Sequence, residues 1–379
     1  MNSLLQFLTQ SFAPILQNQL FPVFREQLGA MSERHEQFVR ALALLQLDGF
    51  VAVRHGRGRR PHDRASMARA FLAKAVFHFP HTRALLDRLQ IDIVLRRLCG
   101  WETAAQVPDE TVFSRAFAEF AKSEFPQRVH AALVQRTQGE RLIGHILRDS
   151  TAIEAREKPR PKALAPTTPP ARRSHHKTKK PKSPEQMTRL DRQCSGAMTL
   201  EQMLSELPRA CDVGCKTNSK GSKHFWIGYK LHLDVADGQI PISCVLTSAS
   251  LNDTQAAVPL SLLTAQRVTS LYDLMDMGYD SQQIREHSAR LGHVPLIPQR
   301  KCGSQQPVMA PHEQIRFRER TGVERVYARL KDEFGGQSVR VRGWAKVMAH
   351  LMFGILALTA DQILRWGGPP KTESPPLTA

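Results

Sequence analysis

The sequence has few acidic residues, few cysteines and no long apolar run, and each shortage excludes a class of protein. Six cysteines in 379 residues form no paired framework and match no strong zinc-finger spacing, which argues against a disulfide-stabilised secreted domain. The longest apolar run, residues 347–360, is shorter than the roughly twenty residues of a membrane span, so we expect a buried helix there. The N-terminal stretch is polar throughout and lacks the basic region of a secretory signal.

The shortage of acids leaves a large positive charge. Lys and Arg number 53 against 35 Asp and Glu, which gives a formal net charge of +18 and a pI of about 10.1. Hydrophobic residues reach 41%, enough for a sizeable core, so the chain is not a wholly disordered polybasic segment. A globular protein this basic suits a polyanion, most commonly nucleic acid. Composition alone leaves open a DNA enzyme, a DNA-binding scaffold and a protein that binds anionic membranes.

Residues 1–140 are expected to form an all-helical domain. Apolar residues recur at helical spacing in four segments, residues 38–45, 67–76, 82–95 and 108–120. A basic, glycine-containing stretch, RHGRGRRPHDR at residues 54–64, separates the first two segments. Short helices joined by a basic turn predict a helix-turn-helix unit, in which Arg57, Arg59 and Arg60 would contact DNA. A plain helical bundle with a solvated basic loop is the alternative.

A second basic segment follows at residues 156–195. Residues 156–192 contain twelve Lys or Arg, three Asp or Glu and seven prolines, with almost no large apolar side chains. Such a segment cannot form a core, and we predict a disordered insertion; residues 367–379 are predicted to be a disordered tail. Its basic side chains, including Lys179 and Lys180, would bind DNA phosphates in a salt-sensitive manner. A solubilising linker is an equally reasonable interpretation.

An α/β domain is expected in residues 141–155 and 210–366. Segments of strand and helix character follow one another in the order strand, strand, strand, helix, strand, helix, strand, helix. The turn Ala236-Asp237-Gly238 between the second and third strands is typical of a hairpin. This order predicts a mixed sheet with helices on its faces.

Three acidic residues of this domain lie at informative positions. We expect Asp149 to end the first strand, Asp276 to end the fourth, and Glu324 to lie in one helix over residues 316–334. Adjacent strand ends and a packed helix can bring three carboxylates together, and a divalent cation relieves their repulsion. Two such ions support in-line phosphoryl displacement. Because Asp is also common at turns, spacing alone leaves an ordinary structural role open.

The motifs around these acids resemble those of DDE transposases of bacterial insertion sequences. The first two matches are LRDSTAIEA around Asp149 and LMDMGYDS around Asp276. The third, FRERTGVERVYARLKDEFG, carries the spacing of the Tyr-Arg-Glu-Lys signature of a large group of these enzymes, at Phe317, Arg320, Glu324 and Lys331. The resemblance covers most of residues 34–364, with the three motifs in order.

The resemblance implies an RNase H-like core in which the three acids are the catalytic and metal-binding residues. It implies Mg²⁺ or Mn²⁺, as two ions, and Arg320 and Lys331 as contacts to DNA phosphates. Phe317 stands where the signature has Tyr. The ring that could pack beside DNA is kept and a hydroxyl is lost, so we expect Phe317 to tune DNA binding rather than abolish activity.

The implied function is that of a DNA transposase acting on double-stranded DNA. It would bind terminal inverted repeats, hydrolyse phosphodiester bonds at the element ends and join the new 3′-hydroxyls to target DNA. The resemblance further implies a homodimer in the end-paired complex and a cytoplasmic, nucleoid-associated protein of bacteria, with no membrane partner. Two alternatives remain: a catalytically silent DNA-binding protein derived from such an element, and a nuclease that never rejoins strands.

Overall fold

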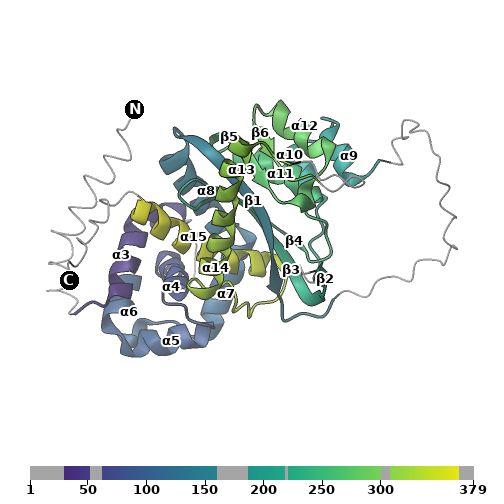
Figure 1. The fold of residues 1–379 in the computed structure, drawn as a ribbon. Helices are drawn as coiled ribbons and strands as arrows, with labels where there is room; N and C mark the ends of the chain where they lie inside the picture. Colours follow the sequence, from purple (N-terminus) through teal and green to yellow (C-terminus); the bar gives the residue numbers. More distant parts are fainter. Residues whose placement is uncertain (1–29, 52–61, 160–186, 218–220, 300–307, 367–379) are drawn as a thin grey trace, which may run out of the picture.

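The computed structural model describes residues 30–51, 62–159, 187–217, 221–299 and 308–366. A bundle of helices comes first in the sequence and packs beside a six-stranded mixed sheet with helices on its faces (Figure 1). This is a mixed α/β architecture with an N-terminal helical region, consistent with an RNase H-like core, and it confirms the predicted fold class.

The N-terminal bundle consists of short helices whose starts are capped by acidic side chains. In order these helices are α3 Glu33–Leu45, η3 Leu47–Phe50, α4 Arg64–Val76, α5 Thr82–Ile91, α6 Ile93–Cys99, η4 Ala104–Gln106, α7 Glu110–Lys122 and α8 Phe125–Gln138. Asp63, Asp92 and Asp109 accept hydrogen bonds from backbone N–H groups in the first turns of α4, α6 and α7. The cap at Asp92 divides the helix predicted over residues 82–95 into α5 and α6.

The sheet has one long central strand that pairs on both edges. Its strands are β1 Leu142–Glu154, β2 Asp212–Thr217, β3 Lys223–Ala236, β4 Ile240–Ser248, β5 Thr269–Met275 and β6 Val294–Leu296. The order is β2-β3-β1-β5-β6, and β4 also pairs with β3. β1 is antiparallel to β3 and parallel to β5, while β5 is parallel to β6. The connections after β4 carry α11 Thr254–Ala265, η6 Met277–Tyr279 and α12 Gln282–Arg290.

Two boundaries differ from the sequence prediction. β1 does not end at Asp149 but continues to Glu154, because its second half keeps pairing with β3 as far as Gly228. The helices α9 Arg189–Cys194 and α10 Leu200–Ser205 precede β2, and α9 falls inside the segment predicted to be disordered. Leu190 of α9 is buried in a cluster with residues of α11 and α12, so ordered structure begins before residue 195.

The predicted helix over residues 316–334 is also divided. It consists of α13 Pro311–Phe317, the 3-10 turn η7 Arg318–Arg320 and α14 Thr321–Asp332. A Cβ atom on Gly322 would lie 2.7 Å from Cδ1 of Leu147, so only glycine lets the first turn of α14 lie this close to β1 without a shift of Leu147.

The last helix, α15 Trp344–Trp366, joins the two parts of the molecule. It contacts α3, α4, α7 and α8 of the bundle as well as α14 and β4, and one hydrophobic core extends across all of them. By length and composition α15 could cross a membrane, but 83% of its apolar window is buried within the protein. It is therefore the core of the fold, as its short apolar run predicts.

Candidate active site

The strand register brings two of the three predicted acids together. Arg148 in β1 lies beside Met275 in the parallel strand β5, so the next residues, Asp149 and Asp276, are neighbours at the same level of the sheet. Asp276 ends β5, as predicted, and its Oδ1 accepts a hydrogen bond from the N–H of Gly278 at 2.9 Å. One oxygen of Asp276 is thus used to hold the turn.

The charge of Asp149 is only partly compensated by its surroundings. Burial, together with the negative charge of Asp276, raises the pKa of Asp149 to about 6. A hydrogen bond from the backbone of Ser150 and the positive charges of Arg320 and Lys216 act in the opposite direction but do not cancel the shift. A carboxylate in this setting favours a nearby cation.

Glu324, at the start of α14, is oriented by an arginine rather than by the other two acids. Arg320 donates to Oε1 of Glu324 at 2.8 Å, and its other nitrogen lies 3.8 Å from Oδ2 of Asp149. The side chain of Glu324 is 55% exposed, compared with 17% for Asp149. Within the described residues, no group of three or more His, Cys, Asp or Glu side chains is close enough to hold a metal ion. The guanidinium therefore lies between two of the carboxylates.

Two known protein families match the chain, and together they cover both parts of the molecule. Residues 140–360, more than half of the chain, match the family described as "Transposase DDE domain". The chain belongs to the DDE transposase family. Residues 25–119 match a second family, "Transposase domain (DUF772)". No curated protein and no solved structure matches the chain. Members of the family cut and transpose DNA and generally use divalent metal ions.

Two further residues of the transposase signature lie next to the acids. Lys331 of α14 donates from Nζ to the hydroxyl of Thr151 at 2.8 Å, two residues beyond Asp149 along β1. Burial, together with the charge of Lys216 in β2, lowers the pKa of Lys331. Phe317 is half-buried, and the guanidinium of Arg320 lies 5.9 Å from its ring centre.

Tyr327 is a site residue of this transposase that sequence reasoning missed. Its hydroxyl donates to the carbonyl oxygen of Asp149 at 2.6 Å, lies 3.2 Å from that of Leu231, and accepts from the N–H of Leu233 at 3.1 Å. Asp149 and Leu233 face each other in the β1–β3 ladder, so Tyr327 attaches α14 to the sheet beside Asp149. In the sequence, Tyr327 lies seven residues before Phe334 on the apolar face expected for a helix. That spacing predicts a core residue and gives no sign of its contact with Asp149.

The remaining predicted DNA contacts fall elsewhere in the chain. Arg57, Arg59 and Arg60 of the basic turn lie outside the described residues, as do Lys179 and Lys180 of the basic segment. Lys216, which was not predicted, is exposed beside the acids and affects both Asp149 and Lys331 electrostatically. Only the pairing of β2 with β3 brings it there.

Proposed function

We propose that this DDE transposase binds the terminal inverted repeats of its element, hydrolyses the phosphodiester bond at each end and joins the 3′-hydroxyls to target DNA. The observation that carries the proposal is the pair Asp149 and Asp276, held side by side by the register of β1 and β5 with a negative charge that is only partly compensated. Structural acids of the same domain, such as Asp234, are paired instead.

The donor set supports a site for Mg²⁺ or Mn²⁺, and we propose two ions. Asp149 and Asp276 would hold them from the sheet, while Glu324 would exchange its contact with Arg320 for the metal. When bound, the metals would activate the attacking oxygen and stabilise the leaving one. Arg320, released from Glu324, would then be free to hold a phosphate of the cleaved strand.

The charges around the acids support a path for DNA along α14. Lys331 and Lys216 flank the site on the side away from Arg320, and both can bind phosphates without reading sequence. We further propose that Phe317 packs beside the DNA and that the two basic segments, at residues 54–64 and 156–192, extend the contact. Binding of this kind should weaken steeply with added salt.

The proposed assembly is a homodimer that pairs the two ends of the element. We place it in the bacterial cytoplasm, associated with the nucleoid, because its substrate and target are both chromosomal DNA. Sedimentation of the protein with and without inverted-repeat DNA tests the dimer.

The test of the proposed function is a Mg²⁺-dependent nicking assay on DNA that carries the flanking inverted repeats. Asp149→Asn, Asp276→Asn and Glu324→Gln should each abolish cleavage and leave end binding intact, because each removes a metal-binding charge but little volume. Metal-dependent cleavage retained in any of the three would overturn the assignment of that residue.

A second candidate is a catalytically silent DNA-binding protein, and one observation favours it. Arg320 lies between Asp149 and Glu324, and the three acids form no metal-type cluster within the described residues. Binding of the inverted repeats without nicking at any Mg²⁺ or Mn²⁺ concentration would support this alternative. Nicking without strand-transfer products would instead indicate a nuclease that never rejoins strands.

A further inference from the structure

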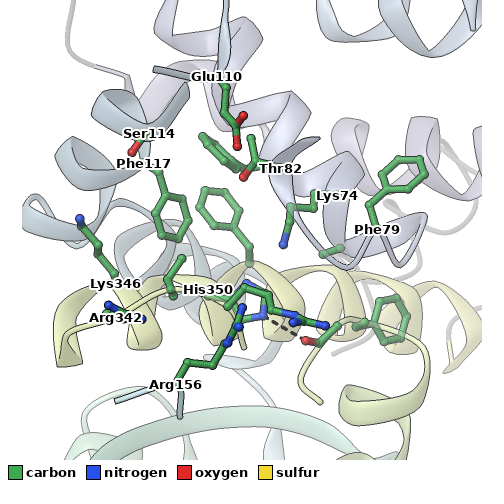
Figure 2. A pocket seen from close by; sticks show the side chains of 17 residues that line it. Lys74, Phe79, Thr82, Glu110, Ser114, Phe117, Arg156, Arg342, Lys346 and His350 are labelled. Atoms are coloured by element: carbon green, nitrogen blue, oxygen red, sulfur yellow. Dashed lines mark hydrogen bonds between the residues drawn. The ribbon is translucent and has the colours of Figure 1, made fainter. Parts of the chain in front are cut away.

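A cavity of about 470 Å³ lies between the N-terminal bundle and the last helix, at the opposite end of α14 from Glu324. Its walls come from α4, α5 and α7 on one side and from α15 and the α14–α15 connection on the other (Figure 2). The volume falls within the range of about 300–1,000 Å³ that is usual for small-ligand sites.

The side chains that line this cavity are strongly positive. Among the described lining residues Glu110 is the one acid, whereas five are cations: Lys74, Arg156, Arg340, Arg342 and Lys346. Within the described part of the chain, none of the five forms a hydrogen bond or an ion pair through its side chain. Lys74 and Lys346 are half-buried, whereas the three arginines are exposed. Arg329, which is also half-buried, is by contrast paired with Glu333 and Asp361.

Lys74 is half-buried and has no side-chain partner among the described residues. It extends from α4 into the cavity, while Arg156 enters from the opposite wall (Figure 2). Burial lowers the pKa of Lys74 to about 8, and burial together with Lys74 lowers the pKa of the neighbouring His350 to about 3. Neutral His350 lies with Nε2 3.0 Å from the carbonyl oxygen of Gly335, so it does not compensate the charge.

Five of the other lining residues are phenylalanines. Phe71, Phe117 and Phe353 pack against one another with ring centres 5.0 to 6.3 Å apart, and Phe79 and Phe334 complete this wall. Cations beside aromatic rings suit a ligand that has both a phosphate and a flat base. A peptide carboxylate would use the cations but would leave the rings without a partner.

We propose that this cavity binds a phosphorylated nucleotide, with its phosphate on Lys74 and Arg156 and its base against the phenylalanine wall. The nucleotide could be free in solution or part of the substrate DNA strand, and the second source rests on the proposed function. Phe334 follows Glu324 by ten residues, just beyond the end of α14 at Asp332, which corresponds to about 15 Å at the rise of a helix. A duplex running along α14 would cover that distance in about four base pairs.

The test measures binding of three probes to the full chain in the absence of divalent metal. The probes are deoxyadenosine 5′-monophosphate, a short single-stranded DNA oligonucleotide and a glutamate-rich peptide, each titrated by calorimetry. Lys74→Met and Arg156→Gln should weaken nucleotide or oligonucleotide binding at least about tenfold, the loss of one charge-assisted contact. Lys122→Met removes the same charge from an exposed position on α7 and should change binding little.

The outcomes distinguish a free nucleotide from a DNA strand as the ligand, and they test the cavity separately from the proposed active site. Binding of the mononucleotide that depends on Lys74 indicates a free nucleotide, whereas dependence seen with the oligonucleotide alone indicates the DNA strand. Equal losses in Lys74→Met and Lys122→Met, no binding of any nucleic-acid probe, or equally tight binding of the peptide would overturn the proposal. Thermal melting of each variant without ligand shows whether it is folded. The Mg²⁺-dependent nicking assay reports on the active site separately, because the acids lie at the other end of α14.

Discussion

Arg148 and Asp149 are adjacent in β1, but they point to opposite faces of the sheet and their charges meet different surroundings. On one face, Arg148 is buried and donates two hydrogen bonds of 2.7 Å to the carboxylate of Asp234. Although burial disfavours its charge, Asp234 and then Asp273 raise the pKa of Arg148 above its usual value. On the other face, Asp149 lies beside a second acid and its own pKa is raised.

The difference separates a charge that supports the fold from a charge that is available for chemistry. Thr264 also donates to Asp234, so the buried pair of Arg148 and Asp234 is closed within the protein. The negative charge of Asp149 is instead only partly compensated by the positive charges of Arg320 and Lys216. Asp149 therefore retains affinity for a cation from solution. Four substitutions test this contrast, and their expected effects decrease in the order given below.

The largest effect is expected on the closed face. Arg148→Met leaves the carboxylate of Asp234 buried without its partner, which should lower the free energy of unfolding by about 3–5 kcal/mol. Urea denaturation measures the loss. Adding Asp234→Asn to this variant removes the buried charge and should restore part of the stability. If Arg148→Met lowered the free energy of unfolding by less than about 1 kcal/mol, the pair of Arg148 and Asp234 would not support the fold as described.

A smaller change of opposite sign is expected on the open face. The folded-state pKa of Asp149, about 6, is above the ordinary value of 3.8, so folding is penalised as pH rises through this window. Asp149→Asn should therefore stabilise the metal-free protein above pH 6 by about 1–3 kcal/mol. The gain should disappear below about pH 3.8, the ordinary value, where the carboxyl becomes protonated in both states. Melting curves in EDTA at several pH values measure it, and a destabilised variant at pH 7.5 would contradict the expectation.

Tyr327 connects the two elements that carry the site, and its hydroxyl contributes less. Tyr327→Phe keeps the ring but leaves the N–H of Leu233 without this acceptor, at a cost of about 1–2 kcal/mol. Because the hydroxyl also holds the carbonyl of Asp149, cleavage should fall more than the lost stability explains. Single-turnover cleavage at a temperature where the variant is fully folded measures this. Unchanged cleavage would limit Tyr327 to a packing role.

The smallest effect on stability is expected at Lys331. Lys331→Met should leave the melting temperature nearly unchanged but weaken DNA binding on all sequences and reduce the salt dependence by about one ion. Binding isotherms at several salt concentrations measure the slope. Lys122→Met, on the surface of α7, is the matched control, and an equal slope change in both variants would remove Lys331 from the DNA path.

Much of the catalytic half of the molecule could be predicted from the sequence. The fold class, the hairpin between β3 and β4 and the end of β5 next to Asp276 follow from local patterns, since turn residues and alternation act over a few positions. The family follows instead from the resemblance of three motifs. The extent of β1 could not be predicted, because residues 150–154 are polar enough to suggest a turn and are ordered by pairing with β3. The break in the helix near Arg320 escaped prediction for a similar reason, since its residues fit a helix locally.

The sequence by itself determined which residues carry charge and in which order the three acids occur. Only the tertiary structure decided which charges are compensated. Arg148 and Asp149 are equivalent in a local pattern, yet register places Asp234 beside one and Asp276 near the other. The tertiary structure also brought α4 onto α15, which placed Lys74 in a cavity lined by four other cations. The physical reason is that the burial and pairing of a charged side chain depend on residues far apart in the chain. Burial and pairing in turn set the pKa of that side chain and its affinity for a ligand.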